Sequence, residues 1–299
     1  MSEASAETLT IGFIGLGKMG GPMAALLVGG GHRVLGFDVS AHALGLLAEA
    51  GGTAVHSAAE AAAADVVVLM LPDSDVVTAV LHDDAVLAAL TVDSIVVDMS
   101  SSEPLRTREL AEELAKHGVH LVDAPVSGGV RGAETGQLTI MVGGEIDIVE
   151  RIKPVLQLLG KPTRAGAVGA GHAVKALNNL MSATHLWVTS EAVIAGREFG
   201  LDPEVMLAMF NTSSGRSGST ENKWPNFILP GSFDSGFGLQ LMLKDMRIAT
   251  ALAKAVGIES LLGDKAVELW SRAADDLEST ADHTEIARWI AAASHATDH

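Results

Sequence analysis

One structural unit recurs along the first half of this chain: a short run of β-branched residues, a turn, and then an Ala- and Leu-rich segment. The runs expected to form strands are residues 10–14, 33–37, 66–71, 94–98, 120–123 and 139–142. Strands that alternate with helices are typical of a parallel sheet covered by helices on both faces. The pattern therefore predicts an α/β domain.

The second half has a different pattern, because the strand signals end at about Gly166. Helices are expected at residues 169–200, 203–211, 239–256 and 261–271, and the strongly apolar stretch 173–195 is expected to be a central buried helix. Residues 213–237 are rich in Ser, Gly and Pro and are expected to form a long loop. With 299 residues, two domains are predicted, an α/β domain over 1–167 and an all-α domain over 168–299.

A glycine motif follows the first expected strand and begins the first helix. It is a G-x-G-x-x-G sequence made of Gly15, Leu16, Gly17, Lys18, Met19 and Gly20. Gly15 permits a tight turn, Gly17 lets a pyrophosphate approach the backbone, and Gly20 lets the helix pack closely on the strand. The motif predicts dinucleotide binding; the alternative is a purely structural turn.

Three other strand ends are candidates for cofactor contact. Asp38 ends the second strand, 18 residues after Gly20, where a carboxylate accepts hydrogen bonds from ribose hydroxyls and repels a 2′-phosphate. This favours NAD over NADP, unless Asp38 only caps the helix that Ser40 begins. Leu71 and Pro72, and later Ser101, follow strands whose carboxyl ends line the ligand crevice of an open sheet.

Two further motifs indicate a site for a small carboxylate and a proton carrier. Ser127, Gly128 and Gly129 supply a hydroxyl and glycine N–H groups that suit an anion, although such a loop is often only a turn. Lys175 shares one helix face with Gly171 and Asn179, and burial of its amine in an apolar helix favours proton transfer near neutral pH. The alternative is a lysine that extends to solvent.

Composition excludes several classes. With 20 Lys and Arg against 37 Asp and Glu, the net charge of −17 argues against nucleic acid as a partner. The absence of Cys and Tyr removes thiolate zinc sites and reductases with a Tyr proton donor. Only His295 and His299 have H-x-x-x-H spacing, at the chain end, so no metal site is predicted. Residues 9–31 are Gly-rich and interrupted by Lys18, which argues against a membrane span or signal peptide.

Taken in order, residues 12–23, 123–129, 171–179 and 244–245 resemble the β-hydroxyacid dehydrogenases, the family of 3-hydroxyisobutyrate dehydrogenase and tartronate semialdehyde reductase. The resemblance implies a Rossmann-type N-terminal domain, an all-α C-terminal domain joined by a long inter-domain helix, and a homodimer or homotetramer. By the same resemblance, Ser127, Gly128 and Gly129 bind the substrate carboxylate, Lys175 is the general acid/base and Asn179 orients the reacting hydroxyl. Lys244 closes over cofactor and substrate, with Phe237 nearby; from sequence alone, Lys244 is either a charge in the cleft or a surface residue.

The resemblance predicts a cytoplasmic NAD-dependent oxidoreductase that interconverts a small 3-hydroxy acid and its 3-oxo acid or semialdehyde. Ser100-Ser101 departs from the Ser-Thr of many members, and the 213–218 sequence does not distinguish among their substrates. Two alternatives stay open, an imine reductase of the same architecture and a non-catalytic nucleotide-binding scaffold. Lys175 argues against the first, and the intact set of Ser127, Lys175 and Asn179 argues against the second.

Overall fold

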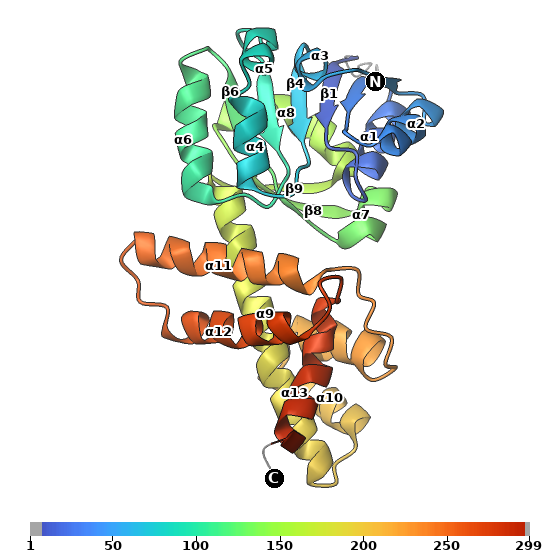
Figure 1. The fold of residues 1–299 in the computed structure, drawn as a ribbon, viewed down its shortest axis with the longest axis vertical. Coiled ribbons are helices and arrows are strands. Elements are labelled where there is room, and N and C mark those ends of the chain that lie inside the picture. Colours follow the sequence, from blue (N-terminus) through green and yellow to red (C-terminus); the bar gives the residue numbers. More distant parts are fainter. Residues whose placement is uncertain (1–7, 297–299) are drawn as a thin grey trace, which may run out of the picture. The chain divides into compact units, whose positions relative to one another are not determined.

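The computed structural model describes residues 8–296, and they divide into two compact units between Lys175 and Ala176 (Figure 1). Residues up to Lys175 form an α/β unit, and those from Ala176 form a helical unit. The helix α9, Ala170–Glu198, begins in the first unit and continues into the second. A long helix at the junction is the feature that the family resemblance implies.

The α/β unit is built on one sheet, with the order β3-β2-β1-β4-β5-β6-β8-β7 and with β9 paired to β8. The strands are β1 (Thr10–Ile14), β2 (Arg33–Phe37), β3 (Thr53–Ala54), β4 (Val66–Leu69), β5 (Ile95–Asp98), β6 (His120–Asp123), β7 (Val126–Ser127), β8 (Leu138–Gly143) and β9 (Gly160–Gly166). From β3 to β6 every pair is parallel, as predicted. The sheet is a Rossmann-type sheet with a mixed edge.

The mixed edge corrects the expectation of a wholly parallel sheet. Strand β8 runs antiparallel to β6 and β7, because only the short helix α7 (Gly129–Thr135) separates it from β7 and no long crossover intervenes. Strand β9 was missed because it is mostly exposed and contains Pro162 and charged residues, a composition suited only to a sheet edge.

Helices cover both faces of this sheet (Figure 1). One face packs against α1 (Gly20–Gly29), α2 (Ala41–Glu49), α7 and α8 (Ile146–Leu159), and the other against α3 (Ala58–Ala62), α4 (Ser74–Leu81), α5 (Asp84–Ala89) and α6 (Pro104–Ala115). Side chains of one strand alternate between the two faces, so that Val66 and Val68 lie in one core and Val67 and Leu69 in the other. The apolar runs of the sequence reflect this two-sided burial.

Ser40 and Ser102 both lie at helix starts, but only Ser40 is a cap. Ser40 accepts a hydrogen bond from the N–H of Ala43 at 3.3 Å and caps α2, as predicted. Ser102 does not cap α6, because its hydroxyl donates to the carboxylate of Asp98 at 2.7 Å and Glu103 occupies the cap position.

The second unit is helical around a core that contains the fully buried Trp270. After α9 come α10 (Pro203–Asn211), the π-helix η1 (Ser219–Ile228), α11 (Leu239–Ala255), α12 (Leu261–Asp276), the 3-10 turn η2 (His283–Glu285) and α13 (Ile286–Ala296). The long-loop prediction was wrong over η1, whose turn signals of Ser, Asn and Pro225 concealed a helix that buries Trp224. Helix α9 is not wholly buried either, since Val174, Met181 and Val188 are exposed on it.

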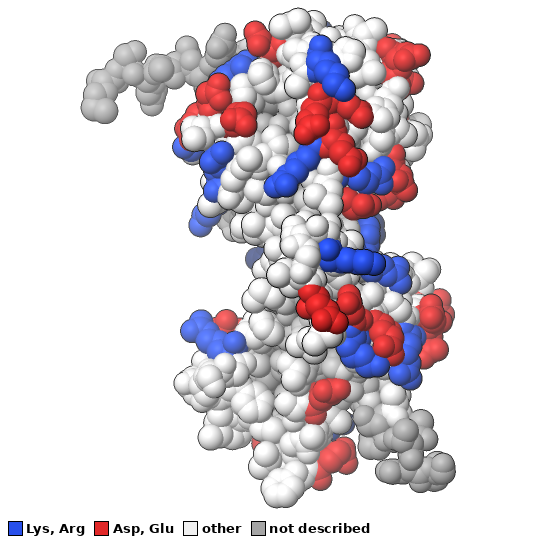
Figure 2. Space-filling model, turned by 90° about the vertical axis from the view of Figure 1, so that its left-hand side faces the viewer, with Lys and Arg blue, Asp and Glu red and all other residues white. Residues whose placement is uncertain are grey.

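Within the described residues, no helix is long and apolar enough to cross a bilayer. Figure 2 shows one face of the molecule, on which Lys and Arg side chains are interleaved with Asp and Glu side chains. This face therefore carries side chains of both signs and no patch of a single sign that covers it.

Candidate functional site

The glycine motif forms the turn between β1 and α1, and each of its glycines has different surroundings. Gly15 has φ of +97°, and a Cβ there would lie 2.3 Å from the carbonyl oxygen of Met70. A Cβ on Gly20 would lie 1.9 Å from the Gly15 oxygen, whereas one on Gly17 would point into open space. Helix α1 has no side-chain cap at its start. The open face at Gly17 and the uncapped N–H groups fit the pyrophosphate of a dinucleotide.

Asp38 lies next to this turn. Its carboxylate accepts hydrogen bonds from the N–H of Leu16 at 2.7 Å and from the N–H of Ser40 at 2.8 Å. Asp38 is therefore more than a cap for α2, since it holds the backbone of the glycine motif to the end of β2. A carboxylate at this position fits the ribose contact that the sequence predicts.

The ends of β4 and β5 are joined by Ser100. Its hydroxyl accepts a hydrogen bond from the N–H of Leu71 at 2.9 Å, and its side chain is buried. Pro72 follows Leu71, and the predicted contact residue Ser101 is half-buried beside Ser100. Of the two serines that replace the Ser-Thr of many family members, Ser100 therefore has a structural contact and Ser101 is the more accessible one.

Lys175 lies against the loop that follows β6. Its Nζ donates to the carbonyl oxygen of Val126 at 2.8 Å, and the side chain is 8% exposed. Ser127 follows Val126 and is exposed, and Gly128 and Gly129 have positive φ angles of 133° and 62°. The structure thus brings the predicted proton carrier together with the predicted carboxylate loop, and it excludes the alternative of a lysine that extends to solvent.

Asp123 holds the helix that carries Lys175, a role that the sequence analysis did not assign. The fully buried carboxylate accepts from the N–H of Gly169 at 2.7 Å and from the N–H of His172 at 2.8 Å. A Cβ on Gly171 would lie 2.2 Å from the carbonyl oxygen of Met141, and one on Gly143 would lie 2.3 Å from the Asp123 carboxylate. Both glycines therefore make room for a charged cap at the start of α9.

His172 is a second buried residue that the sequence analysis missed. Thr107 donates its hydroxyl to the Glu103 carbonyl, so its oxygen accepts from Nδ1 of His172 at 2.9 Å. Nε2 of His172 lies 3.7 Å from the carboxylate of Asp98. These contacts join the end of β5 and the start of α6 to the first turn of α9. The sequence signal that could have revealed them is the presence of polar residues at strand ends.

In the second unit, Asn179 is held by Asp245. The side-chain amide of Asn179 donates to the Asp245 carboxylate at 2.6 Å, and Asn178 donates to the Asn179 oxygen at 3.2 Å. Asp245 is 2% exposed, and its neighbour Lys244 is half-buried. Of the Lys-Asp pair in the sequence, Asp245 therefore fixes the side chain of Asn179.

Phe237, the remaining predicted residue, lies just before α11. Its carbonyl oxygen accepts from the backbone N–H of His283 at 2.9 Å, and its ring contacts the imidazole edge-on with centroids 5.7 Å apart. Over the described part of the chain no group of three or more His, Asp and Glu side chains is placed to hold a metal. The predicted His295–His299 spacing lies outside the side chains that the structure describes.

Two family profiles match the chain, and together they cover most of it. The NAD binding domain of 6-phosphogluconate dehydrogenase matches residues 10–171, and the family described as NAD-binding of NADP-dependent 3-hydroxyisobutyrate dehydrogenase matches residues 169–290. The 2-(hydroxymethyl)glutarate dehydrogenase of Eubacterium barkeri is 40% identical over 83% of this chain and 83% of its own length.

Solved structures agree with these profiles. The 3-hydroxyisobutyrate dehydrogenase of Mycobacterium tuberculosis with L-serine has a TM-score of 0.90 and 34% identity, over 95% of this chain and 99% of its own. An imine reductase from Myxococcus stipitatus has a TM-score of 0.66 but only 18% identity, over 95% of this chain and all of its own, which is a likeness of fold alone.

Proposed function

The chain belongs to the β-hydroxyacid dehydrogenase family of nicotinamide-dependent oxidoreductases, and from that premise we propose that it interconverts a small 3-hydroxy acid and its semialdehyde with NAD. The observation that carries the proposal is the contact of the Lys175 amine with Val126, directly before the Ser127-Gly128-Gly129 loop. A proton carrier next to an anion-binding loop suits a substrate whose hydroxyl lies near a carboxylate.

The substrate class is supported by the molecules that the relatives' names contain. 2-(Hydroxymethyl)glutarate, 3-hydroxyisobutyrate and L-serine each have a primary alcohol on the carbon next to the one that bears a carboxylate. The remainder of each molecule differs, being acidic, methyl or amino. We therefore assign an α-(hydroxymethyl) carboxylate, which is a 3-hydroxy acid with a primary alcohol, as the substrate class and leave its third substituent open.

The proposed roles are those that the family resemblance implies, and contacts within each unit support them. The glycine motif and Asp38 would hold NAD, which would supply the acceptor for a hydride from the carbinol carbon of the substrate. Lys175 takes the proton that the hydroxyl loses, and Ser127 with the N–H groups of Gly128 and Gly129 holds the carboxylate. Asn179, which Asp245 fixes at 2.6 Å, orients the hydroxyl, and Lys244 supplies positive charge toward the cofactor.

A turnover screen tests this proposal. Purified enzyme is assayed with NAD and with NADP on 3-hydroxy acids whose third substituent is methyl, amino, carboxyethyl or hydroxyl. At least one is expected to turn over, and its primary amide is expected to lose at least about tenfold in kcat/KM, since charge-assisted hydrogen bonds are roughly twice as strong as neutral ones. Equal turnover of the acid and its amide would show that the loop does not bind the carboxylate. Reduction of cyclic imines without turnover of any 3-hydroxy acid would support the imine reductase alternative.

A homodimer or homotetramer in the cytoplasm is part of the same proposal. Val174, Met181 and Val188 recur every seven residues along α9 and are 43%, 60% and 54% exposed, so they line one apolar face of the helix. A second copy of the chain is the proposed partner for this face. Light scattering after size-exclusion chromatography is expected to give a multiple of 30.8 kDa, whereas a mass of one chain would contradict it.

A further inference from the structure

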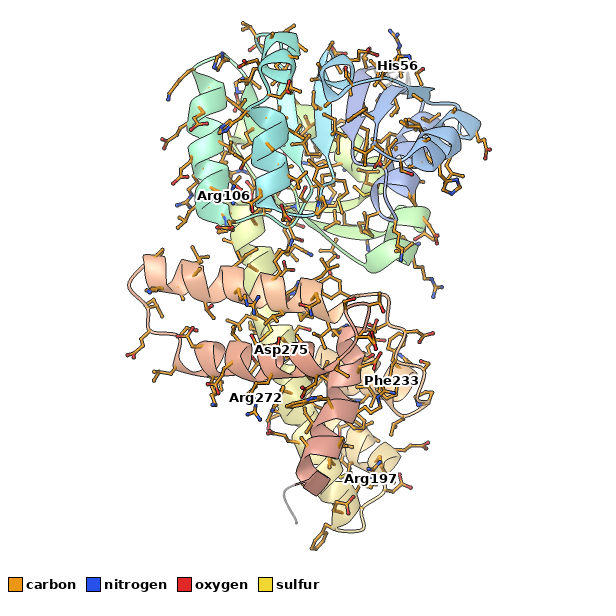
Figure 3. The ribbon with its side chains drawn as sticks, in the orientation of Figure 1. His56, Arg106, Arg197, Phe233, Arg272 and Asp275 are labelled. Atoms are coloured by element: carbon orange, nitrogen blue, oxygen red, sulfur yellow. The ribbon has the colours of Figure 1, made fainter. Side chains whose placement is uncertain are left out.

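Residues 232–238 lead into α11, the helix of Lys244, and they are held in a strained conformation. Phe233 (labelled in Figure 3) has φ of +49°, which is rare for a residue with a side chain, and the guanidinium of Arg288 lies 5.5 Å from the centre of its ring. Gly238 forms an isolated antiparallel bridge with Asp282, and Leu239 donates to the carbonyl oxygen of Ala281 at 2.8 Å. Strain of this kind persists only where surrounding contacts enforce it.

Asp282 supplies several of these contacts. Its carboxylate accepts from the N–H of Gly236 at 2.9 Å, from the N–H of Phe237 at 3.2 Å and from the hydroxyl of Ser235 at 2.8 Å. It also accepts from both the N–H and the hydroxyl of Thr284. Burial opposes the charge of Asp282, but the hydrogen bonds from His283 and Thr284 hold its pKa well below the ordinary value. The carboxylate of Asp282 therefore keeps its charge to a lower pH than an ordinary aspartate.

His283 holds the other side of Phe237. Its imidazole is fully buried, and Nδ1 lies 3.0 Å from the Phe237 carbonyl oxygen and 3.4 Å from the Asp282 carboxylate. The Ser235 hydroxyl, 3.1 Å from Nδ1, already donates its hydrogen to Asp282. Because every neighbour of Nδ1 is an acceptor, Nδ1 carries a hydrogen and donates it to Phe237.

Lys223 completes the cluster from η1. Its Nζ lies 2.7 Å from Nε2 of His283, so one hydrogen is shared between an amine and an imidazole nitrogen. With Nδ1 protonated, the Lys223–His283 pair carries one positive charge, and this charge balances the carboxylate of Asp282. Burial lowers the pKa of both Lys223 and His283, as expected where two basic groups compete for one proton.

We infer that Asp282, His283 and Lys223 form a positioning cluster, which fixes Phe237 and the start of α11 and thereby sets the affinity for the dinucleotide. The cluster holds the backbone N–H, the carbonyl oxygen and the ring of Phe237 at once. The inference rests on the proposed function, because the family resemblance places Phe237 and Lys244 at the cofactor. None of the three cluster residues touches substrate in this scheme.

The test uses the full chain with Lys223→Met, which removes the shared hydrogen but keeps the length of the side chain. NADH affinity is measured by fluorescence titration and compared with kcat at saturating cofactor. We expect the Kd for NADH to rise about threefold or more while kcat stays within about twofold, the pattern of a residue that acts through others. Lys223→Arg restores a donor to His283 and is expected to recover most of the affinity. Lys265→Met, which removes an exposed ion pair with Glu268 on α12, is the matched control and is expected to change neither quantity.

A second measurement addresses the cluster directly and does not depend on activity. In wild-type protein with ¹⁵N-labelled histidine, NMR is expected to show His283 as the neutral Nδ1–H tautomer at pH 7, and Lys223→Met is expected to shift its Nε2 resonance. An Nε2–H tautomer or an imidazolium at His283 would overturn the inference, as would an unchanged NADH affinity in a folded Lys223→Met variant. Wild-type protein that fails to bind NADH while His283 has the expected tautomer would contradict the proposed function instead.

Discussion

The amine of Lys175 is held 2.8 Å from the carbonyl oxygen of Val126, one residue before the loop of Ser127, Gly128 and Gly129. This contact is made by an 8% exposed side chain on a helix whose first turn is capped by the buried Asp123. The position of the amine is therefore set by the backbone on both sides, by β7 at its tip and by α9 at its base. Such restraint would keep the proposed proton carrier aligned without help from the substrate.

Lys175→Ala is expected to lower kcat at least about a hundredfold, because loss of a positioned general acid/base costs roughly 10²- to 10⁴-fold in rate. The variant is expected to fold and to bind NADH, since Ala is a good helix former. Lys175→Arg is not expected to restore the rate, because a guanidinium does not release a proton near neutral pH. Lys153→Ala, which breaks an exposed ion pair with Glu150, is the control. Retention of more than about a tenth of the wild-type kcat would assign the proton to another route.

Asp123→Asn is expected to weaken the start of α9. The carboxylate accepts from two N–H groups, whereas an amide presents an NH₂ group to one of them and leaves that donor unpaired. A buried unpaired donor costs about 1–3 kcal/mol in the free energy of unfolding. Asp147→Asn, at an exposed site in the first turn of α8, is expected to change it by less than about 0.5 kcal/mol. Equal stability of wild type and Asp123→Asn in urea denaturation would show that the cap is dispensable.

Much of the α/β unit was predictable, because the strands that form its centre are buried on both faces. Continuous runs such as Val66–Leu69 are then apolar throughout, and a turn sequence such as Pro72-Asp73 follows them. The elements that were missed carry no such signal. β9 is an exposed edge strand with a Pro, and η1 consists of residues typical of turns and becomes helical through the burial of Trp224 and Ile228. Tertiary packing there outweighs local preference.

The candidate site was likewise predictable only where its residues lie close together in the sequence. The glycine motif, Asp38 and the loop at Ser127 are local in sequence, and the roles proposed for them were expected from their spacing and from the strand before each of them. Asp123 caps a helix that begins 47 residues later, at Ala170, and Asp282 holds Phe237 across 45 residues. No periodicity links such partners, and single Asp and His residues in an acidic chain are most often surface groups. Contacts between distant residues therefore needed the folded structure.

Cofactor choice is expected to follow Asp38. Its charge is fixed beside the glycine motif by the N–H groups of Leu16 and Ser40, and it should repel a 2′-phosphate enough to favour NAD by at least about tenfold in kcat/KM, or ~1.4 kcal/mol. Asp38→Asn keeps an acceptor for one N–H but removes the charge, so the ratio of kcat/KM with NAD to that with NADP is expected to decrease. Rates with both cofactors at matched substrate give the ratio. Equal values for the wild-type enzyme would reduce Asp38 to a structural residue.

The stability of the chain is expected to fall with pH below neutrality through His283. Burial lowers the pKa of this imidazole, while the hydrogen bond with Asp282 opposes that effect and the charge of Lys223 reinforces it. In the unfolded chain a histidine binds its proton at a pKa near about 6.5, above that of His283 in the folded state. The contribution of His283 to the free energy of unfolding is thus complete above the pKa of the unfolded state. It is lost as the pH falls, because only the unfolded state takes up the proton. One such group contributes a slope of at most about 1.4 kcal/mol per pH unit. Asp282 adds nothing to this slope, since its pKa lies far below the range.

His283→Gln is therefore expected to flatten the decrease in the free energy of unfolding between about pH 7.5 and 5.5, measured by urea denaturation of the full chain. The glutamine can still donate to the Phe237 carbonyl but does not titrate, so His283→Gln differs from wild type only in proton uptake and in the contact with Lys223. His56→Gln, at the exposed His56 labelled in Figure 3, is the matched control and should retain the wild-type slope. A wild-type slope in His283→Gln would mean that the imidazole is protonated in the folded protein, and the Lys223 amine would then have to be neutral for the 2.7 Å contact to persist.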